Sequence, residues 1–254
     1  MHIAVITGGS SGIGQATAVE VAKRGVGVIL TYHGSAGRGL ETAERIEKDG
    51  GTAVALPLDV SSQGALSGFR DAVSAALRDR WGRDTFDYLV NNAGVGQPPV
   101  PFEETTEELF DQMVGVHLKG PYFLTQTLLP LITDGGSVVF TTSSAGLLSS
   151  RPSNGYSVYG SVKGAQVVLT RYLAKELSAR GIRVNAVAPG VTRTRLGGDA
   201  FAQHPELIPP IAGNTALGRI GESEDVAAVI AFLLSPEGGW LTAQTLEASG
   251  GYDL

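Results

Sequence analysis

A tyrosine and a lysine, Tyr159 and Lys163, stand four residues apart in the sequence. In a helix, residues at this spacing lie on one face. An ordinary phenol, with a pKa of about 10, is a poor acid or base near neutral pH. A fixed ammonium group beside it lowers that pKa, and the phenol can then exchange a proton with a carbonyl oxygen. The pair therefore predicts proton transfer, although the same spacing also occurs on ordinary helix faces.

A glycine-rich turn near the N-terminus is suited to binding a dinucleotide. Residues 7–14 read Thr-Gly-Gly-Ser-Ser-Gly-Ile-Gly and follow a short apolar run. Glycines permit a tight turn and let a pyrophosphate approach backbone N–H groups, and the following helix adds the positive end of its dipole. The residues expected to contact the cofactor here are Gly8, Ser10, Ser11, Gly12, Ile13 and Gly14.

The end of the second predicted strand bears on the choice between NAD and NADP. An acidic side chain there would bind the adenosine ribose hydroxyls and favour NAD. No carboxylate occurs here: Tyr32 and His33 end the strand, and Ser35 and Arg38 follow. His33, Ser35 or Arg38 could contact a 2′-phosphate. The sequence therefore favours NADP(H), with NAD(H) possible if the ribose is held in another way.

The third and fourth predicted strands also end in residues that suit a ligand. Asp59, followed by Val60, could accept a hydrogen bond from an exocyclic amine such as that of adenine, or could cap the next helix. The small residues Asn92, Ala93 and Gly94 would let a ligand cross the sheet edge, or could form an ordinary turn.

The fifth and sixth predicted strands complete this pattern. Ser143 and Ser144 follow the fifth strand, where a hydroxyl could bond a substrate oxygen. The sixth strand ends in residues that turn the chain or can bond an amide or phosphate, namely Pro189, Gly190, Thr192 and Thr194. All these motifs fall at one edge of the predicted sheet, where open α/β folds bind ligands.

The elements that must position these residues alternate regularly. Short apolar, β-branched runs are expected as strands at 3–7, 26–32, 53–58, 86–91, 137–142, 182–188 and 245–248. Longer amphipathic segments are expected as helices at 12–24, 36–48, 62–80, 106–131, 156–179 and 222–234. This rhythm predicts an α/β fold with a doubly wound, Rossmann-like parallel sheet and helices on both faces. No linker divides the chain, so residues 1–254 are expected to form a single domain.

Residues 193–215 are the least regular long stretch, with glycine and proline pairs. We expect a loop over the sheet's edge, either a passive connection or a substrate lid. Together with loops at 97–102 and 146–155, it would determine the substrate. Few charges occur in these loops, apart from Arg151, Arg193 and Arg195, which favours an uncharged or apolar substrate.

Composition limits the class of protein. The 254 residues are 43% hydrophobic and 17% charged, typical of a folded globular chain, and the net charge of −6 argues against nucleic acid or anionic membranes as partners. No cysteine is present, which excludes disulfides and thiolate zinc sites, and no metal site is expected. No signal peptide and no apolar stretch of about 20 residues are visible. A soluble, cytoplasmic protein is expected.

These motifs, in this order, resemble the short-chain dehydrogenase/reductase family over nearly the whole chain. The resemblance extends to the closing segments 217–219, 224–227 and 249–251. It implies hydride transfer between a nicotinamide cofactor and a carbonyl or alcohol carbon. It also implies that Tyr159 is the general acid/base, that Lys163 lowers its pKa and binds the nicotinamide ribose, and that Ser143, rather than Ser144, polarises the substrate oxygen.

Further roles are implied only by this resemblance. Thr192 and Thr194 would hold the nicotinamide carboxamide and the pyrophosphate. Many members are homotetramers that use the helices containing His117 and Tyr159 at one interface, so a homo-oligomer is expected. Two departures stand out: His117 replaces a frequent asparagine, and Ala243 replaces a frequent glycine. That asparagine helps to hold a water in a proton relay, so His117 either relays protons or supports the site by packing.

The sequence thus predicts an NADP(H)-preferring oxidoreductase that acts on a small-molecule ketone or secondary alcohol. The alternatives are an NAD-dependent alcohol dehydrogenase of the same family and a non-catalytic nucleotide-sensing or scaffold protein. The intact set of Ser143, Tyr159 and Lys163 argues against the last of these.

Overall fold

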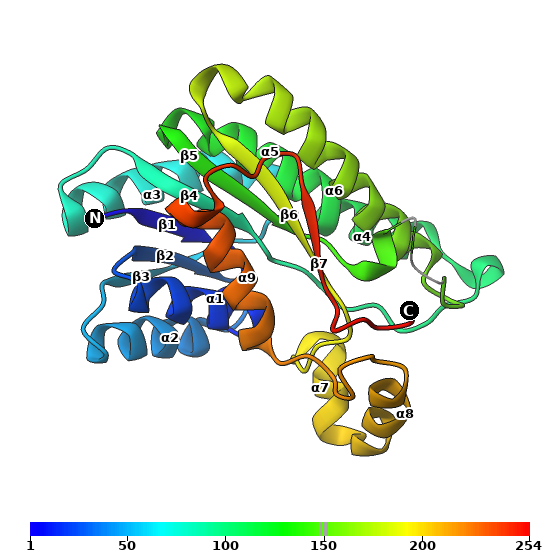
Figure 1. The fold of residues 1–254 in the computed structure, drawn as a ribbon. Coiled ribbons are helices and arrows are strands. Elements are labelled where there is room, and N and C mark those ends of the chain that lie inside the picture. Colours follow the sequence, from blue (N-terminus) through cyan, green and yellow to red (C-terminus); the bar gives the residue numbers. More distant parts are fainter. Residues whose placement is uncertain (148, 150–151) are drawn as a thin grey trace.

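The core of the protein is a parallel sheet. The computed structural model describes residues 1–147, 149 and 152–254. Within these residues the sheet has seven strands in the order β3-β2-β1-β4-β5-β6-β7, all parallel (Figure 1). The strands are β1 (Ile3–Ile6), β2 (Gly27–Tyr32), β3 (Ala53–Pro57), β4 (Phe86–Asn91), β5 (Ile132–Thr141), β6 (Arg183–Pro189) and β7 (Thr245–Ala248). The predicted doubly wound, Rossmann-like sheet is confirmed.

Helices cover both faces of the sheet. One face carries α1 (Gly12–Lys23), α2 (Ala36–Lys48) and α9 (Ser223–Leu234). The other carries α3 (Leu66–Trp81), α5 (Gly120–Leu128) and α6 (Ser157–Glu176), with α4 (Glu107–Val114) packed against α6. Each face has its own apolar core, so the central strands are buried on both sides. This burial explains why β1, Ile-Ala-Val-Ile, is a continuous apolar run rather than an alternating one.

The long helix predicted at 106–131 is interrupted in its middle. Between α4 and α5, residues Gly115–Lys119 form a π-helical segment, η3, in which the N–H of Gly120 donates to the carbonyl of Gly115. Pro121 has no N–H group with which to continue the α-helical hydrogen-bond pattern. Gly120 packs against the chain that follows β3, because a Cβ on this residue would lie 2.5 Å from the carbonyl oxygen of Val60. π-Helical insertions are frequent at functional sites, and this one contains His117.

The segment 193–215 is helical, so the predicted irregular loop is wrong. It contains α7 (Leu196–Gln203), a single 3₁₀ turn at Pro205–Leu207, and α8 (Ile208–Gly213). The prolines that suggested irregularity stand in the first turns of these elements. Proline is tolerated there because the first N–H groups of a helix have no partner within it.

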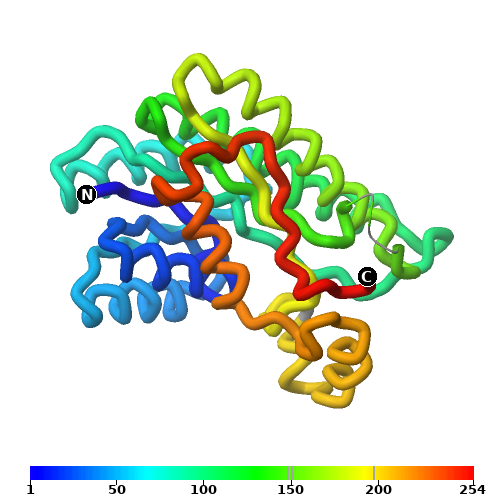
Figure 2. Tube along the Cα trace, viewed as in Figure 1, coloured from blue at the N-terminus to red at the C-terminus, as the bar shows by residue number. Residues whose placement is uncertain are grey.

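The C-terminal tail runs beside the end of this segment, as the tube in Figure 2 shows. Thr215 and Tyr252 form an antiparallel bridge, and the N–H groups of Ala216 and Leu217 donate to the carbonyls of Gly251 and Gly250. Ala243, which replaces the family's glycine, has a positive φ of 59°. Among the described residues, no helix is both long and apolar enough to cross a membrane.

Candidate active site

The strand order reverses direction between β1 and β4, which creates a crevice at the carboxyl ends of the strands. Because the strands are parallel, the predicted motifs after β1 to β6 all meet at this edge. The structure therefore brings the sequence-predicted residues together at one site.

The glycine-rich turn after β1 is shaped by close backbone contacts. Gly8 and Gly12 have positive φ angles of 70° and 55°. A Cβ on Gly14 would lie 2.3 Å from the carbonyl oxygen of Gly8, so α1 can approach the turn only with glycine there. Ser11 precedes α1, and its side chain makes no capping hydrogen bond to the first N–H groups of the helix. The turn thus fits a pyrophosphate, which those N–H groups could bind.

Asn92 joins β4 to β1. Its side-chain Nδ2 donates to the carbonyl oxygen of Thr7 at 3.0 Å, and the N–H groups of Asn92 and Ala93 both donate to Thr7 Oγ1 at 2.9 Å. These bonds hold the ends of β1 and β4 together at the base of the crevice. Asn92 therefore shapes the site by positioning the backbone. Gly94 follows, and a Cβ there would lie 2.9 Å from Cε1 of His117.

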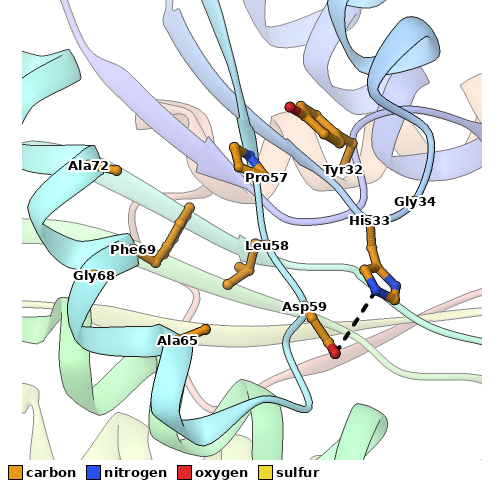
Figure 3. Close-up of a pocket in the computed structure, with 10 residues that line it drawn as sticks. All are labelled: Tyr32, His33, Gly34, Pro57, Leu58, Asp59, Ala65, Gly68, Phe69 and Ala72. Atoms are coloured by element: carbon orange, nitrogen blue, oxygen red, sulfur yellow. Dashed lines mark ion pairs between the residues drawn. The ribbon is translucent and has the colours of Figure 1, made fainter.

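A hollow of about 370 Å³ opens beside the ends of β2 and β3 (Figure 3). His33 and Asp59 face each other at its rim, with Nε2 and Oδ2 3.9 Å apart. The other oxygen, Oδ1, accepts hydrogen bonds from the N–H of Ser61 at 2.9 Å and from its hydroxyl at 2.7 Å. The bond from the Ser61 hydroxyl is the main reason that the pKa of Asp59 is lowered. Asp59 therefore shapes the turn with one oxygen and keeps the second towards His33.

The start of α2 carries the positive charge predicted for a 2′-phosphate. The guanidinium of Arg38 donates to the hydroxyl of Ser35, which directly precedes the helix. Neither the end of β2 nor the first turn of α2 contains an acidic residue. This arrangement leaves a guanidinium, a hydroxyl and a helix N-terminus together, a set suited to a phosphate.

Ser143 is held against α6 by glycine packing. It precedes a short 3₁₀ turn, η5 (Ser144–Gly146), and its Oγ accepts a bond from the N–H of Ala145 at 3.2 Å. A Cβ on Gly146 would lie 2.6 Å from the backbone N of Gly164. Because Gly146 and Gly164 have no side chains, η5 lies directly on the helix that carries Tyr159.

Tyr159 is partly buried and hydrogen-bonded to the side chain of Ser143. Burial raises its pKa, the bond with Ser143 acts in the opposite direction, and the charge of Tyr156 raises it further. The predicted lowering of this pKa is therefore wrong for the protein without ligand. Lys163 Nζ lies 5.7 Å from the centre of the Tyr159 ring and donates to the carbonyl oxygen of Thr141 at 2.8 Å.

Lys163 is only 4% exposed, and this burial lowers its pKa from 10.5 to about 7. An ammonium group loses hydration when it enters a protein interior, so its neutral form is favoured. One carbonyl partner offsets only part of that loss. A buried lysine that can change charge near neutral pH, beside a tyrosine and in a crevice, is typical of a catalytic site.

His117 packs between the catalytic candidates and the loop after β4. Its ring meets the ring of Tyr159 edge-on, and its Nε2 lies 3.0 Å from the carbonyl oxygen of Val95 and 3.4 Å from the N–H of that residue. Burial, together with the charge of Lys163, lowers its pKa to about 3. The imidazole is therefore neutral at ordinary pH.

Gln166 is a site residue that the sequence analysis missed. It is 2% exposed, lies one turn beyond Lys163 on α6, and donates from Nε2 to the carbonyl oxygen of His117 at 2.5 Å. The signal was available, because residues 163 and 166 are both polar on one face of a helix whose other inward residues are mostly apolar.

The predicted lid is fixed at both ends. The N–H of Arg193 donates to the carbonyl of Gly221 and the N–H of Gly221 donates to that of Val191, which joins the two ends of the segment. Thr194 also touches the glycine turn, since a Cβ on Gly12 would lie 3.3 Å from its side chain. Gly190 packs against Ser249. Of the predicted loop at 146–155, residues 148, 150 and 151, including Arg151, lie outside the described residues.

Comparison with known proteins agrees with this fold. The family model described as enoyl-(acyl carrier protein) reductase matches residues 8–253. An NADPH-dependent aldehyde reductase-like chloroplast protein of Arabidopsis thaliana is 31% identical, over 99% of this chain and 94% of its own.

Two solved structures are similar throughout. The promiscuous reductase LugOII, which catalyses keto-reduction at C1 in lugdunomycin biosynthesis, has a TM-score of 0.93 and 35% identity, over 100% of this chain and 98% of its own. The angucycline C-6 ketoreductase LanV with bound NADP has a TM-score of 0.92 and 35% identity, over 99% of this chain and 95% of its own. LanV is also solved with NADP and rabelomycin.

A doubly wound sheet with a serine, a tyrosine and a lysine at its switch-point edge is typical of a nucleotide-dependent oxidoreductase. The chain belongs to the short-chain dehydrogenase/reductase family, and it is an enzyme of that class.

Proposed function

We propose that this chain is an NADP(H)-preferring ketoreductase in which Tyr159 is the general acid/base. The observation that carries the proposal is the contact set of Tyr159, which is hydrogen-bonded to Ser143 and faces the buried ammonium of Lys163. A phenol between a hydroxyl and an ammonium can donate a proton to a substrate oxygen and be stabilised as phenolate.

The cofactor's residues fit its parts. The glycine turn from Gly8 to Gly14 and the first N–H groups of α1 would hold the pyrophosphate, while the hollow near Asp59 would take the adenosine. Lys163 would hold the nicotinamide ribose, and Thr192 and Thr194 would hold the nicotinamide carboxamide and the pyrophosphate. When bound, the nicotinamide supplies or accepts the hydride.

Side chains of the protein would protonate the substrate oxygen and stabilise the negative charge that develops on it. Tyr159 would donate its proton to that oxygen during reduction, and Ser143 would hydrogen-bond it as negative charge develops. Lys163 would stabilise the phenolate that Tyr159 leaves. With a pKa of about 7, Lys163 could itself release a proton near neutral pH and so restore the phenol.

The preference for NADP(H) is supported by the start of α2. Arg38 and Ser35 provide a charged and a neutral donor for a 2′-phosphate, and the end of β2 contains no carboxylate to repel it. LanV, at 35% identity, binds NADP. Both points favour NADP(H) over the alternative, NAD(H).

The substrate we propose is a small-molecule ketone without charge, bound under the segment 193–215 as a lid. Leu196 and Leu207 of this segment are 47% and 43% exposed, and they are apolar groups available to a ligand. The ends of the segment are fixed at Arg193 and Gly221, so α7 and α8 could move as one unit about these points. LugOII catalyses keto-reduction at C1 in lugdunomycin biosynthesis, and the C-6 ketoreductase LanV is solved with rabelomycin.

The test is turnover of a panel of uncharged aromatic and aliphatic ketones with NADPH and with NADH. We expect activity with NADPH, and we expect Tyr159→Phe to abolish it while leaving NADPH affinity, measured by cofactor fluorescence, nearly intact. Lys163→Ala should weaken both turnover and cofactor binding. Tyr172→Phe, an exposed tyrosine on the same helix, is the control. Retained turnover in Tyr159→Phe would refute the role of this residue.

A further inference from the structure

Gln166 has a buried side-chain amide, although the structure of its helix does not require a polar residue at this position. It is 2% exposed, and within the described part of the chain its Oε1 has no hydrogen-bond partner. Burial of an amide costs free energy unless it is bonded. Among the described residues, the side chain of Gln166 makes one hydrogen bond, from Nε2 to the carbonyl oxygen of His117. The contribution of Gln166 must therefore come through His117.

The sequence explains why the carbonyl of His117 takes a side-chain donor. In an α-helix this carbonyl would accept from the N–H of the residue four positions later. That residue is Pro121, which has no N–H. The helix here widens into η3, and Gln166 reaches across from α6 to supply a donor. Gln166 thus replaces a backbone bond with one that joins two helices.

The other side of His117 faces the reacting groups. Its ring meets the ring of Tyr159 with centroids 5.6 Å apart, and its Nε2 contacts Val95 in the loop after β4. Lys163, one turn before Gln166 on α6, lies close enough for its charge to lower the pKa of His117. A displacement of the His117 backbone would therefore disturb the contacts of the ring with both Tyr159 and the loop after β4.

We propose that Gln166 is a positioning residue, which holds the backbone of His117 so that the imidazole ring supports Tyr159 in its reactive position. The inference rests on the proposed ketoreductase function. It predicts that loss of the amide lowers the rate of the chemical step and leaves ground-state binding of ketone and cofactor largely unchanged.

The experiment compares Gln166→Met with Thr170→Val in the full chain. Methionine keeps the length of the side chain and removes the donor. Thr170 is fully buried one turn further along α6, and its hydroxyl bonds the carbonyl of Gln166 at 2.8 Å, so its loss also removes a buried hydrogen bond but does not reach His117. We expect kcat to fall about ten- to hundredfold in Gln166→Met. The KM for ketone and the Kd for NADPH should change little, and Thr170→Val should keep its kcat.

Gln166→Glu gives an independent readout. Its carboxyl group can donate to the His117 carbonyl only while it is protonated, and burial raises the pKa of such a group. We expect kcat of this variant to approach that of the wild type at low pH and to decline at higher pH, along a limb that the wild type lacks. This profile also decides the matter if Gln166→Met does not fold.

Two results would overturn the inference. In the first, Gln166→Met and Thr170→Val would lower kcat by the same small factor. In the second, Gln166→Glu would keep the pH profile of the wild type. Failure of the proposed function is distinct from both, because the wild type itself would then bind NADPH and turn over none of the ketones.

Discussion

The imidazole ring of His117 stands edge-on to the phenol ring of Tyr159, with centroids 5.6 Å apart and ring planes at 87°. The Nε2 atom is engaged with the backbone of Val95, and a pKa of about 3 keeps the ring neutral. Both observations favour support over proton relay, the two roles that the sequence left open. His117 thus contacts both the tyrosine and the loop after β4.

Exchange of His117 tests this role. His117→Leu should lower kcat about tenfold or more, because leucine cannot bond Val95 and the loop loses its support. His117→Asn retains a polar group and should retain more activity. The measurement is kcat between pH 5 and 8. Because a ring that stays neutral does not titrate in this range, the pH dependence of kcat should be parallel for the wild type and His117→Asn. A limb near pH 6.5 that is present only in the wild type would instead indicate a relay.

The buried Lys163 predicts how stability depends on pH. Its pKa is about 7 in the folded protein and 10.5 in its ordinary state, so between these values the unfolded chain binds more protons than the folded one. The free energy of unfolding therefore increases with pH in this window. Below pH 7, Lys163 is charged in the folded protein, and the full cost of burying that charge is present.

The comparison is the free energy of unfolding of the ligand-free wild type and of Lys163→Met, measured by denaturant titration from pH 7 to 9.5. Well inside this range the wild type should gain about 1.4 kcal/mol per pH unit relative to the variant, as expected for one proton, and the slope should be about half as steep at pH 7. The lost bond to Thr141 adds only an offset that does not depend on pH. If the free energies of unfolding of the two proteins changed in parallel with pH, burial would not lower the pKa of Lys163 in the folded protein.

Gly146 is predicted to be essential for the position of Ser143. In Gly146→Ala, the new Cβ would lie 2.6 Å from the backbone of Lys163 and Gly164, so η5 would have to leave α6. A shift of about 1 Å in a reacting group can cost about a hundredfold in rate, and forced overpacking costs about 1–3 kcal/mol in stability. Both should be measured, as kcat and as the free energy of unfolding.

The control for this variant is Gly64→Ala, where a Cβ would meet nothing within 4 Å. Its kcat should equal that of the wild type. Equal activity of Gly146→Ala and Gly64→Ala would mean that the close packing of η5 on α6 does not position Ser143.

Arg38 is predicted to determine the preference for NADP(H). Arg38→Ala removes the guanidinium beside Ser35, and a charge-assisted bond to phosphate is worth about 1.5–3 kcal/mol, or roughly ten- to a hundredfold in affinity. The Kd for NADPH should rise by that factor, whereas the Kd for NADH should hardly change. Cofactor fluorescence titrations provide both values. Arg45→Ala, an exposed arginine in the last turn of the same helix, is the control. A parallel rise for NADPH and NADH would contradict a contact with the 2′-phosphate.

The sequence by itself determined the sheet and the residues at its edge. Apolar β-branched runs specify buried parallel strands through local pattern and hydrophobicity, and glycine at positions 8, 12 and 14 is required by a turn that only glycine can make. Tyr159 and Lys163 could be paired because helical spacing is a local property. The prolines near α7 and α8 do not by themselves determine the structure there, since proline can end a regular segment or begin a helix.

Only the tertiary structure decided what surrounds these residues. The pKa values of Tyr159 and Lys163 depend on burial by elements distant in sequence, and burial reversed the predicted direction for Tyr159. The roles of His117 and Gln166 likewise follow from a helix–helix contact across 49 positions of sequence. Spacing along the chain carries no information on such contacts, because they arise when the fold brings η3 and α6 together on one face of the sheet.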